Sequence, residues 1–92
     1  MEQNDLQRAI MAVLFAAGEP VSAQRLAESL ERDVEEIDRE TKSLMDELSF
    51  NRSGIRIVKM EDAYQMCSSA EMSVWVTKTL ETRKPPKLSP SQ

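Results

Sequence analysis

The sequence predicts a mainly α-helical domain with one small β-hairpin, arranged as a winged helix-turn-helix. Three observations lead to this fold. Three helical segments come first, and the second and third are joined by about three residues, as in a helix-turn-helix motif. Two β-rich runs follow as a hairpin. A fourth helical segment completes the order helix, helix, helix, strand, strand, helix.

The first helix is expected to start at Asn4 and to end at Gly18. Asn4 and Gln7 have the spacing of a capping box. Glycine accepts the left-handed conformation of a helix end, and Pro20 cannot continue a helix. Apolar side chains recur at helical intervals between these limits, namely Leu6, Ile10, Val13, Leu14 and Ala17.

The second and third helices are also bounded by capping residues. Ser22 is a suitable N-cap for a helix over 23–30. Asp33 is expected to cap the third helix, with Glu36 in the reciprocal position of a capping box. Thr41 fills a gap in the apolar stripe of this third helix, which comprises Val34, Ile37, Leu44, Met45 and Leu48.

The chain then changes to a hairpin and a last helix. Residues 55–60 and 63–67 flank a turn at Glu61 and Asp62, which predicts the wing. Ser68 and Glu71 have capping-box spacing before the fourth helix. We expect Trp75 to anchor that helix in the core. One face of it carries Met72, Trp75, Val76, Thr79 and Leu80, and Met60, Met66 and Met72 are expected to fill the core.

These elements predict one winged-helix domain over residues 1–82. Residues 83–92 hold three of the four prolines and are expected to form an extended linker. The longest apolar stretch, 9–17, is too short to span a bilayer, so no membrane segment is predicted. The single cysteine, Cys67, gives no sign of an oxidising compartment, and we expect a cytoplasmic protein.

The charge of the chain disfavours nucleic acid as a partner. The net charge is -4 and the pI about 4.8. Residues 33–50, the expected recognition helix, contain seven acidic residues and two basic ones, so phosphates should be repelled. An alternative is a transcriptional regulator that binds DNA through its wing. The bases available to it are Arg52, Arg56 and Lys59, with Lys78, Arg83, Lys84 and Lys87 near the C-terminus.

An enzyme is the least favoured function. The chain has no histidine, and Cys67 has no second thiol, so we expect no metal, no cofactor and no catalytic residues. Glu36 and Glu40 lie on one helical face at i, i+4 spacing and are the only acid/base pair considered. Acids opposite an apolar stripe usually form a solvated face.

The first helix is the best candidate for binding a protein partner. Residues 9–17 carry no polar side chain, although burial on one side alone does not require this. A second covering surface is one explanation, and the high helix propensity of alanine is the other. The candidate interface residues on this helix and on the wing are Met11, Ala12, Phe15, Ala16, Ile57, Val58 and Tyr64.

The order and spacing of several stretches resemble the amino-terminal domain of the bacterial segregation and condensation protein B family. Residues 15–22 resemble that family's exit from helix one, and residues 26–30 its second helix. Residues 54–58 and 63–66 resemble its wing strands, and residues 87–90 its interdomain linker. Glu61 and Asp62 stand where the family often has glycines, and Phe50 where tyrosine is frequent.

This resemblance implies a non-enzymatic subunit that forms homodimers and binds the kleisin subunit of the bacterial condensin complex. Through the kleisin it would join the ATPase of the structural-maintenance-of-chromosomes type, in the cytoplasm and at the nucleoid. It would act in chromosome condensation and segregation during the cell cycle, without sequence-specific DNA binding. The family continues into a second winged-helix domain, so the chain is expected to be a fragment.

Overall fold

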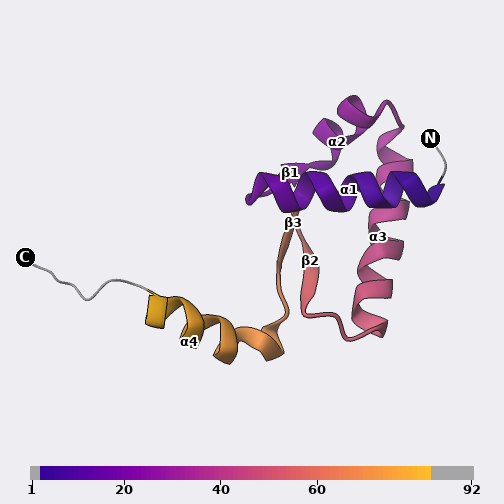
Figure 1. Cartoon of the computed structure of the whole chain (residues 1–92). Helices are drawn as coiled ribbons and strands as arrows, with labels where there is room; N and C mark the ends of the chain where they lie inside the picture. The colour runs from indigo at the N-terminus through magenta and orange to yellow at the C-terminus, as the bar shows by residue number, and fades with distance from the viewer. Residues whose placement is uncertain (1–2, 84–92) are drawn as a thin grey trace, which may run out of the picture.

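The computed structural model describes residues 3–83 and has the predicted order of helices and hairpin (Figure 1). The winged-helix fold is thereby confirmed, with one additional short strand and one short 3-10 helix. The elements are α1 (Gln3–Ala17), β1 (Val21–Ser22), α2 (Ala23–Leu30), α3 (Val34–Phe50), β2 (Ile55–Met60), β3 (Ala63–Ser68), η1 (Ala70–Met72) and α4 (Ser73–Arg83). The predicted linker lies outside the described residues, except for Arg83, which ends α4.

The sheet has three antiparallel strands in the order β1-β3-β2. β2 pairs with β3 along its whole length, from Ile55 opposite Ser68 to Met60 opposite Ala63. β1 adds Val21 opposite Tyr64. A two-residue strand is too short to show alternation in a sequence, which is why β1 was not predicted. It attaches the start of α2 to the wing.

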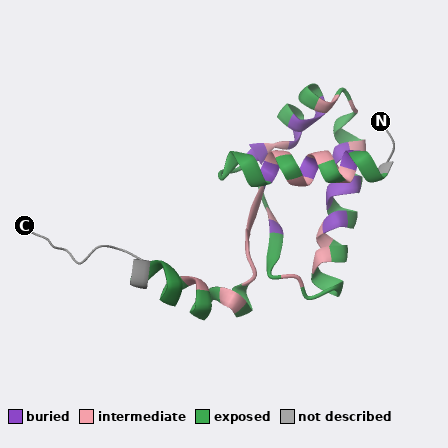
Figure 2. Cartoon of the chain, in the orientation of Figure 1, coloured by how far each residue is buried: buried purple, intermediate pink, exposed green. Residues whose placement is uncertain are grey.

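The hydrophobic core lies where α1 crosses α2, α3 and the sheet, and Figure 2 shows that α1 alternates buried and exposed positions along its length. The predicted stripe of α1 supplies three side chains with no exposed surface. The core side chains are Leu6, Ile10, Leu14, Val21, Ala23, Leu26, Ala27, Ile37, Leu44, Ile57 and Tyr64. Most of the apolar positions predicted on the first three helices therefore face one core.

Two of the predicted helix ends are confirmed. Ser22 accepts a hydrogen bond from the backbone N–H of Arg25 through its side-chain oxygen, at 3.1 Å. Gly18 has a φ of +65°, and its N–H lies 3.4 Å from the carbonyl oxygen of Leu14. The left-handed backbone that ends α1 is thus adopted by a glycine, as expected.

All three predicted capping boxes are wrong. Asn4 lies within α1, which begins at Gln3, and the side chain of Gln7 donates to Glu40 instead. Asp33 precedes α3 but makes no side-chain cap bond, and Glu36 pairs with Arg32 instead. Ser68 does not cap the next helix because it is the last residue of β3, and Ser69 stands at the position directly before η1. Ser69 precedes η1, and its hydroxyl donates to the carbonyl oxygen of Ser53 at 2.6 Å. α4 therefore begins later than predicted.

α4 projects away from the core, contrary to the prediction that Trp75 anchors it there. The helix packs mainly against η1, and most of its surface is exposed in Figure 2. Trp75 is 60% exposed, and Val74 and Leu80 are exposed as well. The expectation that Met60 fills the core is also wrong, because Met60 lies at the solvent-exposed wing tip, whereas Met66 packs against the core.

Thr41 lies in the α3 stripe as predicted, but its hydroxyl is an unsatisfied polar group. The side chain is fully buried, and Oγ1 has no hydrogen-bond partner among the residues that the structure describes. We expect Thr41→Val to stabilise the domain by about 1 kcal/mol, because it removes a buried hydroxyl without changing the side-chain shape. Urea unfolding measures this change. The matched control is Thr79→Val on exposed α4, and an unstable Thr41→Val protein would contradict the prediction.

Candidate functional site

The exposed side of α1 forms an uncharged apolar surface. Phe15 is 78% exposed, Ala12 and Ala16 are exposed, and Met11 is partly buried against the core. We call these four residues the α1 surface. No charged side chain interrupts α1 between Arg8 and Glu19. The structure therefore brings together all four helix-one residues predicted from the sequence.

Phe15 is exposed because of its position on the helix. Leu14, its neighbour, points into the core and is fully buried, and each residue turns the helix by about 100°. Covering a phenylalanine side chain with apolar surface is worth about 1.5–3 kcal/mol. Alanines on either side leave room for a second backbone to approach closely. The α1 surface is consequently suited to contact another helix.

The wing contributes less to the candidate surface than predicted. Ile57 is 4% exposed and Tyr64 is 2% exposed, so both belong to the core. Successive side chains of a strand point to opposite faces, and β2 turns Ile57 inward while it leaves Val58 half-buried on the other face. Val58 remains available, whereas the assignment of Ile57 and Tyr64 to an interface is corrected.

Tyr64 has a structural role that its sequence position did not reveal. Its hydroxyl donates a hydrogen bond of 2.6 Å to Oδ1 of Asp38 on α3. Burial raises the pKa of the Tyr64 phenol above its ordinary value of 10, and the hydrogen bond and the negative charge of Asp38 raise it further. The wing is thereby fastened to α3 by a neutral phenol.

This raised pKa predicts a loss of stability at alkaline pH. Below pH 10 the phenol is protonated in both states, and the bond to Asp38 is intact. Above pH 10 the unfolded chain loses the phenolic proton more easily than the folded domain, so unfolding becomes more favourable as pH rises. We expect the free energy of unfolding to fall between about pH 9 and pH 11, and to fall less in Tyr64→Phe. Urea unfolding at both pH values, with absorbance of this sole tyrosine as the readout of phenolate, tests it. An equal loss in both proteins would contradict it.

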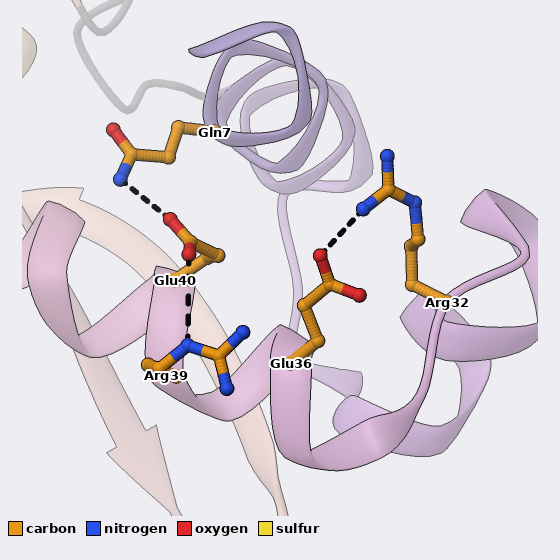
Figure 3. Close-up of polar contacts among 5 residues, drawn as sticks. All are labelled: Gln7, Arg32, Glu36, Arg39 and Glu40. Carbon is orange, nitrogen blue, oxygen red and sulfur yellow. Dashed lines mark hydrogen bonds and ion pairs between the residues drawn. The ribbon is translucent and has the colours of Figure 1, made fainter. Parts of the chain in front are cut away.

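Glu40 joins α1 to α3 inside the domain (Figure 3). Its side chain is buried, and Oε1 accepts a hydrogen bond of 2.9 Å from Nε2 of Gln7. Nε of Arg39 lies 3.8 Å from Oε2. The expectation that the α3 acids form a solvated face is therefore wrong at Glu40, because the carboxylate has partners that compensate its burial.

The remaining α3 face is less acidic than the sequence suggested. Glu36 and Asp38, like Glu40, are engaged in contacts within the domain. The exposed acids are Asp33, Glu35, Asp46 and Glu47, beside the exposed bases Arg39 and Lys42. The face is still negative on balance, so it still disfavours a phosphate backbone.

The three wing bases line one groove, but acidic side chains are set among them. Nη2 of Arg52 lies 4.0 Å from Oε2 of Glu71, and Nζ of Lys59 lies 5.8 Å from the centre of the Tyr64 ring. Arg56 is exposed on β2. An open groove of about 800 Å³ runs between α3 and β2, and its lining includes acids as well as these bases. A groove lined by both acids and bases is poorly suited to bind the phosphates of a nucleic-acid backbone.

The described residues contain no arrangement typical of a catalytic or metal site. Glu36 and Glu40, the pair considered above, are bound to different partners, and neither lines the α3–β2 groove. Within residues 3–83, no three acidic or cysteine side chains are grouped so that they could hold a metal ion. No described helix has the length and apolar character needed to cross a bilayer.

Residues 8–92 match the family described as segregation and condensation complex subunit ScpB. The segregation and condensation protein B of Alkaliphilus metalliredigens is 36% identical over 84 residues, which cover 91% of this chain and 44% of that protein. The one from Caldanaerobacter subterraneus is 42% identical over 72 residues, or 78% of this chain and 43% of that protein. The chain thus spans about half the length of the curated relatives it matches.

Two solved structures are similar to the fold. ScpB from Mycobacterium tuberculosis has a TM-score of 0.87 and 27% identity, over 97% of this chain and 56% of that one. A dimer of the ScpB N-terminal domain complexed with ScpA peptide has a TM-score of 0.77 and 22% identity, over 83% of this chain and 95% of that one. At 22% identity, the second similarity shows a shared fold and nothing more specific.

Proposed function

The chain belongs to the family of segregation and condensation complex subunit ScpB, and from this premise we propose that it is a non-enzymatic interaction domain of a bacterial condensin complex. In that role it acts in chromosome condensation and segregation, in the cytoplasm and at the nucleoid. Its proposed role is to bind other proteins of the complex. This role requires an exposed binding surface and does not require an active site.

The proposed partners are a second copy of the chain and the kleisin subunit. The support is the similar solved structure of an ScpB N-terminal domain, which is a dimer with an ScpA peptide bound. The kleisin in turn connects the dimer to the ATPase of the complex. At 22% identity this comparison shows the fold alone. The residues through which this chain would bind its partners therefore follow from its own exposed surface.

The α1 surface is the observation that carries the dimer proposal. Phe15 and the alanines beside it present apolar area that the domain itself leaves uncovered. A surface of this kind is typical of the centre of a protein interface, where aromatic side chains are enriched and charges are depleted.

Sedimentation equilibrium of the purified chain tests the dimer, and co-purification with a kleisin subunit tests the second partner. We expect a dimer at micromolar concentration and a stable complex with the kleisin. A strictly monomeric species at high micromolar concentration would refute the dimer. If the chain forms the dimer but does not co-purify with the kleisin, its function is limited to self-association.

Binding of duplex DNA is the alternative, favoured by Arg56 and Lys59 on the exposed wing. A titration at low salt distinguishes it, because binding through phosphates weakens steeply as salt rises. We expect no binding at low salt. Salt-sensitive binding that Arg56→Ala and Lys59→Ala reduce would instead assign the wing to DNA.

A further inference from the structure

β2 is an edge strand of the sheet, and no strand pairs with its outer side in the described part of the chain. The strand order is β1-β3-β2, so β2 has β3 on one side only. Figure 1 shows its other side turned toward α3, and the open groove of about 800 Å³ lies between the two. We call this outer side of residues 55–60 the β2 edge. Such an edge presents backbone N–H and C=O groups with which a further strand can pair.

The register of the hairpin shows which residues turn their backbone groups to the β2 edge. Gly54 accepts a hydrogen bond of 2.8 Å from the N–H of Ser69, and these two residues continue the register of β2 and β3. Bonded and unbonded pairs alternate along an antiparallel ladder, so the even-numbered residues of β2 bond to β3 and the odd-numbered ones face outward. The N–H of Ile55 fits this pattern, because it donates to Oγ of Ser53 at 3.3 Å. The outward backbone groups without a partner among the described residues are those of Ile57 and Lys59.

The two faces of β2 differ in character along this edge. Ile55 and Ile57 lie on one face, since side chains alternate along a strand, and Met45 and Leu48 of α3 line the groove together with them. Arg56 points to the opposite face and is exposed. No acid of the described residues lies within ion-pair distance of Arg56. A strand added at the β2 edge would therefore meet apolar side chains on one face and an unpaired base on the other.

We propose that the β2 edge binds an extended segment of a partner protein, in which apolar and acidic residues alternate, as a fourth antiparallel strand. Main-chain hydrogen bonds supply the affinity of such a contact, and alternate side chains supply its specificity. The apolar residues lie beside Ile57, and the carboxylates lie beside Arg56. A second copy of β2 is disfavoured at this edge, because pairing would bring the bases of both copies together and like charges across strands repel. None of the four residues of the α1 surface lines the groove, so the inference does not depend on the proposed dimer.

Binding of a fluorescein-labelled peptide of alternating valine and glutamate to the whole chain tests the proposal, with fluorescence anisotropy as the readout. In the antiparallel pairing, the residue opposite Ile57 is a valine and turns its N–H toward β2, whereas the glutamates turn theirs away. We expect a dissociation constant below about 1 mM. Methylation of the valine amide nitrogens should abolish binding, and methylation of the glutamate amide nitrogens should preserve it. No binding of the unmodified peptide, or an equal effect of the two methylations, would overturn the proposal.

Two variants of the whole chain test the acidic character of the partner. Arg56→Glu reverses the charge beside the β2 edge, and Arg25→Glu makes the same change of net charge on α2, where Arg25 is exposed and outside the groove. We expect Arg56→Glu to weaken binding of the peptide about fivefold and Arg25→Glu to leave it unchanged. Urea unfolding checks that both variants keep the fold. Equal weakening by both variants, or equally tight binding of a peptide with lysine in place of glutamate, would overturn the proposal.

Discussion

Phe15→Asp is expected to raise the dissociation constant of the dimer at least about 100-fold, which corresponds to about 3 kcal/mol. The substitution removes the largest apolar side chain of the α1 surface and would place an unpaired carboxylate in an apolar contact. Because Phe15 is mostly exposed in the single domain, the free energy of unfolding of the monomer should change little. Sedimentation equilibrium over a range of concentrations measures the dissociation constant, and urea unfolding checks the fold.

Phe50→Asp is the matched control for this experiment. Phe50 is also strongly exposed, but it ends α3 at the far side of the domain from the α1 surface (Figure 1). It should therefore leave the dissociation constant unchanged. Equal weakening by both substitutions would indicate a general effect of surface charge, and a Phe15→Asp protein that sediments as a wild-type dimer would exclude the α1 surface as the interface.

Glu40→Ala is expected to lower the free energy of unfolding by about 2 kcal/mol. It leaves Nε2 of Gln7 without the carboxylate it contacts and opens a void between α1 and α3. Glu40→Gln keeps an oxygen that can accept the bond from Gln7, so its effect should be smaller. Urea unfolding of the three proteins at one pH ranks them.

Glu36→Ala provides the comparison on the same helix (Figure 3). Glu36 pairs with Arg32, and both side chains remain about a quarter exposed, so this ion pair is worth less than about 1 kcal/mol. The two carboxylates look equivalent in the sequence, at i, i+4 spacing. If removing Glu36 destabilises the domain as much as removing Glu40, the structural role assigned to Glu40 is wrong.

The helices were predictable because their apolar spacing and end residues are local. The spacing of Leu6, Ile10 and Leu14 indicates the buried face of α1, and Gly18 indicates where the helix ends. Local pattern fails where a residue serves a distant element. The hydroxyl of Ser69 is used by the carbonyl of Ser53, and the carboxylate of Glu40 by Gln7, and neither partner is visible from spacing along one helix.

The exposure of Phe15 on α1 was predictable, whereas the burial of Ile57 and Tyr64 on the wing and the direction of α4 were not, for the same reason. All-round apolarity of residues 9–17 is a property of one segment, and it indicated Phe15 correctly as a residue beyond the needs of the core. The direction that α4 takes after the sheet is set by the backbone around η1. The apolar face of α4 therefore predicted burial, although the helix carries Trp75 away from the core.

The short η1 acts as the pivot of a lever. α4 has 11 residues, so its far end lies about 16 Å from the pivot, and a rotation of 10° at η1 moves that end by about 3 Å. The pivot is held by the N–H of Ser69 on the carbonyl of Gly54 and by its hydroxyl on the carbonyl of Ser53. The loop after α3 thus sets the angle of the arm, and small changes of sequence in that loop would swing the free end of α4 relative to the core.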